Sequence, residues 1–556
     1  MKNPVVWRTL VVVGACLPFV GAQHAAPLQS APPGPTLTPQ DSAFHALNRL
    51  AYGPRPGDVP RVVADGVMRW IDRQLSPDGI DDDRWAQRER RFDILKYDRG
   101  DLAALYAEAQ RERRERKLTA GQTAEGPDSV GAQHAAPLPE QTSLPTPADP
   151  MIPKSRRLAG EFADLAVVRA ALSERQLFEV MVDFWTNHFN IYFAKGADRF
   201  LTPDYIEHTI RPRAMGKFED LLIATAKSPA MLFYLDNWES VAPGTSPPFP
   251  LSARRRGGQG ARPMPKGINE NYARELLELH TVGVDGGFTQ QDVIDVARIF
   301  TGWSIERPQQ GGDFEFHGWA HDTGEKQVLG VRFQAGHGMD EGIRLLKLLA
   351  NQPATMHHVS RKLCQRFVND DPPDGCVDDA VAAWKRSSGD MREVLRAIFH
   401  GPDFWAAENV RAKVKTPLEF VVSAARAVAA EPDTSPRLAQ VVARLGEPLY
   451  LHVAPDGYPE REAAWVNSGA LLDRMNAAVA LAAGKLQGVT VVLDSVVSTG
   501  DADQLVDAVN EKILGGTMSE NTKQVLRRQV ADISNPTQAR ALAVGLAIGG
   551  PEFQRQ

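Results

Sequence analysis

Apolar residues recur at helical spacing along most of the chain, and Gly- and Pro-rich breaks separate the helical runs. The run at residues 269–303 carries the densest mixture of polar and aromatic side chains. At about 100° per residue, residues 271–280 form an amphipathic helix. Its apolar face holds Tyr272, Ala273, Leu276, Leu277, Leu279 and also His280. Its polar face holds Asn271, Arg274, Glu275 and Glu278. After a Gly-rich turn, Thr289 and Asp292 resemble a capping box that starts the next helix.

A second amphipathic helix is predicted for residues 174–193, with Ser173 and Gln176 as its capping-box start. Its wide apolar face carries His188 among aromatic residues. Its narrow polar stripe consists of Gln176, Glu179, Asp183, Asn187 and Asn190. A buried imidazole needs a hydrogen-bond partner or a metal ion, so His188 and His280 raise the same question on two different helices.

The pattern changes after residue 303. Residues 314–316 and 328–333 alternate between apolar and polar side chains, as short strands do. Between them lies a polar loop that contains His321 and Asp322, and we expect a β-hairpin there. From residue 342 onward the pattern is again helical. The sequence therefore predicts a mainly α, multi-helix globular fold with a small β-hairpin insert.

The N-terminal sequence predicts export from the cytoplasm. Residues 1–22 combine the basic residues Lys2 and Arg8, a short apolar run and the small-residue sequence Val20-Gly21-Ala22, as a signal peptide does. We expect six segments after it: a Pro-rich disordered segment at 23–40, an N-terminal helical part at 41–118, a low-complexity linker at 119–153, a central helical core at 154–305, the hairpin insert at 306–340 and a C-terminal helical part at 341–556. The sequence VGAQHAAPL occurs twice, at 20–28 and at 130–138, both times in low-complexity sequence.

Export predicts a periplasmic or extracellular location. The sequence has three cysteines, and Cys16 lies in the predicted signal peptide. In an oxidising compartment Cys364 and Cys376 either form a disulfide or both remain free thiols. No other segment is apolar enough to cross a bilayer, so we expect no transmembrane segment in the mature chain. The net charge of −6 argues against a general nucleic-acid-binding protein.

Two histidines and a polar loop are candidates for metal binding. If the helices that carry His188 and His280 pack together, these side chains could share a polar network or a divalent metal ion. His321 and Asp322 are further candidate ligands, because imidazole and carboxylate groups bind such ions. The alternative is that all four have structural roles, the two helical histidines in the core and the other two residues in a hairpin turn.

Glu275 and Glu278, with Arg274 beside them, are candidate catalytic residues. Either carboxylate could act as a general base. The alternative is that the three side chains form a solvated, ion-paired helix face. Farther along the chain, His357 and His358 are adjacent and cannot both face one site on a helix.

Several segments match, in order, those of a known family. They include ERQLFEVMVDFWTNHFN, NENYARELLELHTVGVDGGFTQQDV, HDTGEKQVLG, KVKTPLEFVVSAAR and YPEREAAWVNSGALLDRMN. In these segments the chain resembles the uncharacterised bacterial family catalogued as domain of unknown function 1800, over residues 41–556 apart from the linker. The resemblance implies a mostly helical fold, an exported location and an exported sulfatase-like protein as partner. It implies no catalytic residue, because the family has no agreed activity.

Three functional hypotheses follow, and whether the protein is an enzyme stays open. The first is an exported binding or assembly protein of the cell envelope that acts with a partner, with the polar stripe and aromatic residues as its interface. The second is a metal-dependent enzyme on an envelope or polymeric substrate, which uses His188 and His280. The third is a metal-free hydrolase with a Glu275/Glu278 general base. The sequence has no G-x-S-x-G, H-E-x-x-H or P-loop motif, which disfavours serine hydrolases, zincins and NTPases of familiar type.

Overall fold

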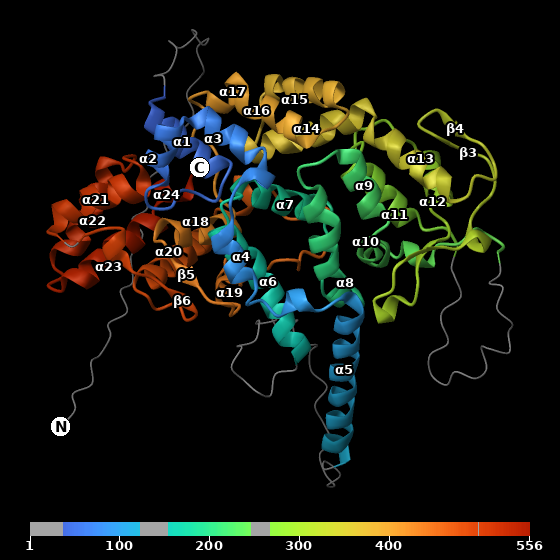
Figure 1. The fold of residues 1–556 in the computed structure, drawn as a ribbon, viewed down its shortest axis with the longest axis horizontal. Coiled ribbons are helices and arrows are strands. Elements are labelled where there is room, and N and C mark those ends of the chain that lie inside the picture. Colours follow the sequence, from blue (N-terminus) through green and yellow to red (C-terminus); the bar gives the residue numbers. More distant parts are fainter. Residues whose placement is uncertain (1–36, 123–153, 246–266, 499) are drawn as a thin grey trace, which may run out of the picture. The chain divides into compact units, whose positions relative to one another are not determined.

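Helices dominate the residues that the computed structural model describes, which are 37–122, 154–245, 267–498 and 500–556. Figure 1 shows these helices packed around one another, with only short strands among them. The mainly α fold with small hairpins that the sequence predicts is confirmed. The predicted signal peptide, both copies of VGAQHAAPL and most of the 119–153 linker lie outside the described residues.

The helices follow one another along the chain with mostly short connections. Those of the first half are α1 (Pro39–Arg49), α2 (Asp58–Asp65), α3 (Val67–Gln74), α4 (Asp83–Glu89), α5 (Arg99–Gln122), α6 (Lys154–Leu172), α7 (Gln176–His188), α8 (Asp198–Asp204), α9 (Phe218–Ala226), α10 (Pro229–Tyr234), α11 (Glu270–Glu275) and α12 (Gln290–Ile299). Those of the second half are α13 (Met339–Ala350), α14 (Pro353–Phe367), α15 (Asp374–Ser387), α16 (Met391–His400), α17 (Pro402–Trp405), α18 (Pro417–Ala427), α19 (Arg437–Arg444), α20 (Ser468–Ala482), α21 (Ala502–Leu514), α22 (Glu520–Ala531), α23 (Pro536–Gly549) and α24 (Pro551–Gln554). Two π-helical segments continue from α8 and α11, η3 (Tyr205–Ile210) and η7 (Leu276–His280).

The strands of the described residues form three antiparallel two-stranded sheets. They pair β1 (Trp303–Ile305) with β2 (Phe314–Phe316), β3 (Lys326–Val328) with β4 (Val331–Phe333), and β5 (Glu431–Pro432) with β6 (Val489–Thr490). The pairing we expected, between residues 314–316 and 328–333, is wrong. Leu329 and Gly330 both have positive φ, 49° and 78°, and they make residues 326–333 a hairpin of its own. A leucine in that backbone conformation is uncommon, so the turn left no signal in the sequence.

Helices α7 and α14 lie in the core and position the site described below. Buried apolar side chains of α7 include Leu177, Val180, Met181, Phe184 and Trp185, and those of α14 include Val359, Leu363 and Phe367. A disulfide joins Cys364 of α14 to Cys376 of α15, with the two Cα atoms 6.2 Å apart. The question that the sequence left open for these cysteines is thus answered in favour of pairing.

Helix α7 is shorter than predicted and starts differently. It begins at Gln176 and ends at His188, and no side chain caps its N-terminus. Ser173 instead donates its hydroxyl hydrogen to Asp82, and the amide oxygen of Gln176 accepts from the backbone N–H of Tyr52. Both side chains are used in contacts between distant parts of the chain, which local spacing cannot reveal. The capping box of Thr289 and Asp292 is confirmed.

The polar stripe of α7 faces other parts of the same chain. Glu179 forms two hydrogen bonds with Arg211, and Asp183 pairs with Arg366. Farther along, Asn190 donates to the backbone carbonyls of His452 and Ala454. The stripe therefore does not form an open surface on α7, because most of its polar side chains bond to other parts of the same chain. Its role as an interface stays a prediction.

Candidate functional site

Two histidines from different helices bind the end of η7. Helix α11 widens into this π-helical segment instead of continuing as the α-helix that the sequence predicts. His188 Nε2 lies 3.2 Å from the carbonyl oxygen of His280, and His358 Nε2 lies 3.3 Å from that of Leu279. Because a carbonyl oxygen only accepts, both imidazoles donate from Nε2. They thus satisfy carbonyls that a helix end leaves without partners, and π-helical segments often occur at functional sites.

The three imidazoles form one cluster, hereafter the histidine cluster (His188, His280 and His358). The ring centroids of His188 and His280 are 6.2 Å apart, and those of His188 and His358 are 6.5 Å apart. His188 and His280 are buried, as the helical pattern predicts. His188 Nδ1 and His280 Nε2 have no hydrogen-bond partner among the described residues. The cluster therefore offers free imidazole nitrogens in the core.

Burial keeps the cluster uncharged at neutral pH. It lowers the pKa of His280 to about 3 and that of His358 to about 4, and the positive charge of nearby Lys362 adds to both shifts. The pKa of His188 falls well below its ordinary value for the same two reasons. Neutral imidazoles can accept a proton, donate a hydrogen bond or bind a metal ion. They cannot neutralise a neighbouring charge.

Helix α14 presents three basic residues on one face. His358, Lys362 and Arg366 are spaced by four residues, which places them one above another. Arg366 is buried and lies within 3.2 Å of carboxylate oxygens on three residues, Asp183, Glu419 and Glu460. Lys362, one turn earlier, has neither a hydrogen bond nor an ion pair with any residue that the structure describes. Burial lowers its pKa, although Glu460 and Asp456 counteract that effect.

A cavity of about 250 Å³, lined mainly by residues with polar side chains, lies between α7, α14 and the loop at residues 456–461, and we call it the α7–α14 cavity. Its lining consists of Phe184, Asn187, His188, Lys362, Gln365, Asp456, Gly457, Tyr458, Pro459, Glu460 and Arg461. His188 is buried, whereas Asp456, Pro459 and Arg461 are exposed. The cavity therefore has a buried end at the histidine cluster and an exposed rim on the loop.

The 456–461 loop is held in place by contacts along its length. The side chain of Asn187 exchanges two hydrogen bonds with the backbone of Tyr458. Gly457 has a φ of 75°, and a Cβ there would lie 2.3 Å from the carbonyl oxygen of Asn187. The Nζ of Lys413 donates to the carbonyl of Glu460 at 2.8 Å. The rim of the cavity is thus preorganised rather than left to an open loop.

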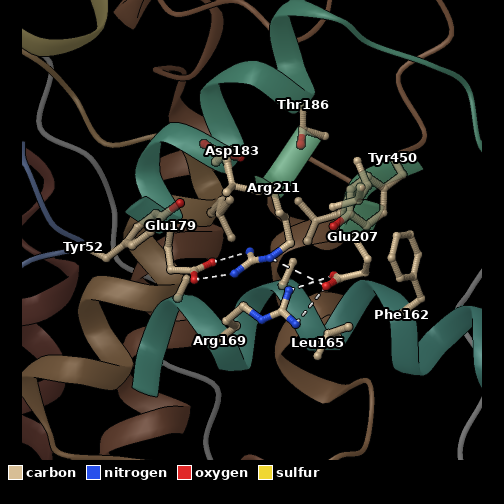
Figure 2. A pocket seen from close by; sticks show the side chains of 16 residues that line it. Tyr52, Phe162, Leu165, Arg169, Glu179, Asp183, Thr186, Glu207, Arg211 and Tyr450 are labelled. Atoms are coloured by element: carbon tan, nitrogen blue, oxygen red, sulfur yellow. Dashed lines mark hydrogen bonds and ion pairs between the residues drawn. The ribbon is translucent and has the colours of Figure 1, made fainter. Parts of the chain in front are cut away.

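A smaller cavity of about 40 Å³ lies on the other side of α7 (Figure 2). Figure 2 shows Arg211 between Glu179 and Glu207, with Arg169 bonded to the same Glu207. Asp183 lines this cavity too, and its partner Arg366 also pairs with Glu460, which lines the α7–α14 cavity. The space is about enough for one water molecule, so this network holds α6, α7 and η3 together and offers little room for a ligand.

The structure places His321 and Asp322 in a different environment from the histidine cluster. His321 Nδ1 donates to the carbonyl of Thr301 at 2.9 Å, and Asp322 forms a two-pronged ion pair with Arg298. Next to them a buried ion pair joins Lys326 Nζ to Glu341 Oε2 at 2.6 Å. These contacts fasten the β3–β4 hairpin to α12 and α13. In the described residues no group of three or more His, Cys, Asp or Glu side chains is arranged to hold a metal ion.

The candidate general bases lie on α11 and η7, and none of them lines the α7–α14 cavity. Arg274 pairs with Glu278 at 3.3 Å and also donates to Gln290. Burial, with the nearby charge of Glu278, raises the pKa of Glu275. Their geometry is that of a half-buried ion-paired face.

The family model described as "Protein of unknown function (DUF1800)" matches residues 45–555. The chain belongs to this family. The match covers nearly all of the described residues, including α7, α14 and the 456–461 loop. No curated protein and no solved structure matches the chain. The part of this family member that the structure describes contains no helix of the length and apolarity that spanning a membrane requires.

Sequence reasoning named His188 and His280 as candidate ligands and Asn187 as part of the polar stripe, and it assigned no role to His358. His188 and His280 were identified because each interrupts an apolar helix face. Lys362 and the 456–461 loop were missed. The spacing of His358, Lys362 and Arg366 is a usable signal, because a row of basic residues on one face of a half-apolar helix predicts acidic or anionic partners.

Proposed function

We propose that the chain is an exported binding protein that holds its ligand in the α7–α14 cavity. One observation carries this proposal: Lys362 lines a cavity and has no direct partner among the described residues, while the neighbouring carboxylates of Glu460 and Asp456 contact other groups. A partly buried cation without a partner costs free energy, and proteins keep such groups mainly where something binds. Binding sites are typically concave and lined by a few well-placed polar groups.

The neighbourhood of the cavity supports binding rather than mere packing. Its rim is fixed by the Asn187–Tyr458 hydrogen bonds, and its far end adjoins imidazoles with free nitrogens. Because the rim is already ordered, ligand binding costs less conformational entropy. The volume of about 250 Å³ is just below that of typical small-molecule pockets, so it suits a small molecule or the end group of a larger one.

A variant that fills the cavity tests the proposal. Gln365 lines the cavity from α14, so Gln365→Phe should occupy part of it. Gln524 is exposed on α22, so Gln524→Phe is the matched control. Ligand-observed NMR would screen a library of small polar fragments against the wild type and both variants, after circular dichroism has shown equal folding. Fragments that lose binding only in Gln365→Phe support the proposal, and equal binding to all three proteins contradicts it.

Export is the second part of the proposal. It is supported by the signal-peptide pattern of residues 1–22 and by the Cys364–Cys376 disulfide, because disulfides persist in oxidising compartments. Fractionation of cells that express the full chain would test it. A processed chain in the periplasm or medium is expected, and an unprocessed cytoplasmic chain would contradict export. The sulfatase-like partner stays a prediction, which affinity capture from the same fractions would test.

The metal-dependent enzyme is a second candidate function, favoured by one observation. His188 Nδ1 and His280 Nε2, two predicted ligands, are unpartnered and belong to one cluster. Mass spectrometry of the metal content, on protein purified without chelators or a His-tag, tests this candidate. A near-stoichiometric metal that is lost in folded His188→Ala and His280→Ala variants would favour the enzyme. A wild type without metal would leave the binding protein ahead.

A further inference from the structure

The charge of Lys362 has no direct ion-pair partner in the part of the chain that the structure describes. The ammonium group faces the α7–α14 cavity, and no carboxylate of the described residues lies within ion-pair distance of it. On the same helix Arg366 has three carboxylate partners. Arg366 is therefore surrounded by carboxylates, whereas Lys362 faces the cavity without a direct partner.

The acidic residues around the cavity already have partners. Glu460 lies 3.1 Å from Arg366, and Asp456 lies 3.1 Å from His452 Nε2. The remaining cation of the lining, Arg461, lies 2.9 Å from Asp371. Glu460 and Asp456 favour the charged form of Lys362, but both carboxylates lie beyond ion-pair distance of it and contact other groups. The histidine cluster is uncharged at neutral pH and cannot balance a positive charge either.

A positive charge without a direct carboxylate partner, at a half-enclosed cavity, is complementary to one anionic group. Resting on the proposed binding function, we propose that the α7–α14 cavity recognises an oxyanion on its ligand, a carboxylate or a phosphate group, and that Lys362 binds it. The ligand then supplies the partner that Lys362 lacks among the described residues. Because the cavity is small and its rim is exposed, the anionic group enters and the rest of the ligand extends outward over the 456–461 loop.

Calorimetric titration with simple anions tests this assignment. Acetate, inorganic phosphate and glycerol 3-phosphate are compared with uncharged methyl acetate at constant ionic strength, which separates carboxylate from phosphate sources. We expect at least one anion to bind and the neutral ester not to bind. Lys362→Gln should weaken binding at least about tenfold, as expected for the loss of a charged hydrogen bond. Arg361→Gln, an exposed neighbour on the same helix, is the control and should bind like the wild type.

Chemical labelling gives a second measurement that does not depend on affinity. Pyridoxal phosphate, an anionic aldehyde, forms an imine with a lysine amine and releases water, and borohydride reduces the imine to a stable secondary amine. Mass spectrometry then locates the label. We expect pyridoxal phosphate to label Lys362 faster than the exposed Lys347, uncharged pyridoxal to show no such selectivity, and added phosphate to slow the reaction.

The two proposals fail in different ways. If neutral fragments bind in the cavity but no anion does, and Lys362 labelling does not depend on the phosphate of the aldehyde, the anion assignment is wrong and the binding function stands. If anions bind equally to the wild type and Lys362→Gln, the assignment to Lys362 is wrong. If neither fragments nor anions bind the wild type, both proposals are overturned.

Discussion

Asn187 and Tyr458 are joined by two hydrogen bonds although 271 residues separate them in the sequence. Asn187 Nδ2 donates to the carbonyl oxygen of Tyr458 at 2.8 Å, and Asn187 Oδ1 accepts from its backbone N–H at 2.6 Å. The side-chain amide thus pairs with the backbone N–H and C=O of one residue, as a residue of a neighbouring strand would. This contact sets the distance between α7 and the 456–461 loop, and with it the width of the α7–α14 cavity.

Removal of the Asn187 amide should loosen this loop. We expect Asn187→Ala to lower the free energy of unfolding by about 1–3 kcal/mol, the sum of two ordinary hydrogen bonds. Hydrogen exchange of the backbone amides at residues 456–461 should accelerate more than exchange elsewhere. Asn271→Ala, at an exposed position of α11, is the control and should change neither quantity. Unchanged protection of the loop in Asn187→Ala would show that other contacts hold it.

Gly457 is required by both backbone conformation and space. In Gly457→Ala the new Cβ would meet the carbonyl oxygen of Asn187 at 2.3 Å, at a positive φ. Gly484 also has a positive φ, 64°, but open space around it, so Gly484→Ala measures the conformational cost alone. We expect about 1 kcal/mol for Gly484→Ala and clearly more for Gly457→Ala, by urea unfolding. Equal losses of unfolding free energy in the two variants would show that the 456–461 loop relaxes around the new methyl group without further destabilisation.

Asp183 should make stability depend on pH. Burial, with the charges of Glu460 and Glu419, raises its pKa to about 7 from an ordinary 3.8, although Arg366 opposes the shift. Between about pH 4 and 7 the folded chain therefore keeps a proton that the unfolded chain has released. The free energy of unfolding should fall as the pH rises through this window. In Asp183→Asn this fall should be smaller, whereas Asp285→Asn, at an exposed site, should follow the wild type.

The disulfide should stabilise α14, the helix that carries His358, Lys362 and Arg366. Cys364 and Cys376 are separated by 12 residues, and closing a loop of this size is worth about 2–4 kcal/mol. We expect the variant Cys364→Ala/Cys376→Ala to unfold at a lower temperature than the wild type, in proportion to this loss of free energy. Reductant should not change the unfolding temperature of the variant. A thiol assay on the denatured mature protein should find no free thiol. Detection of two thiols would show that the pair is reduced where the protein resides.

Loss of one partner of the Lys326–Glu341 ion pair should destabilise the protein more than replacement of both. Both side chains are buried, so Lys326→Met alone leaves a buried carboxylate without its partner and should cost about 3–5 kcal/mol. The double variant Lys326→Met/Glu341→Leu should recover most of that loss, because two apolar side chains need no partner. Lys347→Met, exposed on α13, should stay within about 0.5 kcal/mol of the wild type. Chemical denaturation of these proteins, together with the single variant Glu341→Leu, measures the coupling.

Local patterns accounted for the helices and for which faces are buried. The burial of His188 and His280 follows from their positions among apolar residues at a spacing of three and four. The capping box of Thr289 and Asp292 is equally local, since both hydrogen bonds join residues three apart. Turns with unusual residues were not predictable in this way. The Leu329-Gly330 turn and the π-helical end of α11 depend on the packing around them.

The sequence by itself determined the mainly α fold, the family and the two buried histidines, because helical periodicity and motif order are written along the chain. Only the tertiary structure decided that His188, His280 and His358 meet and that His321 bonds to Thr301 beside the β3–β4 hairpin instead. It also decided that Lys362 has no direct partner among the described residues. Which charges pair is a property of distances between residues far apart in the sequence. Those distances are set by how all the helices pack together, and no local pattern contains them.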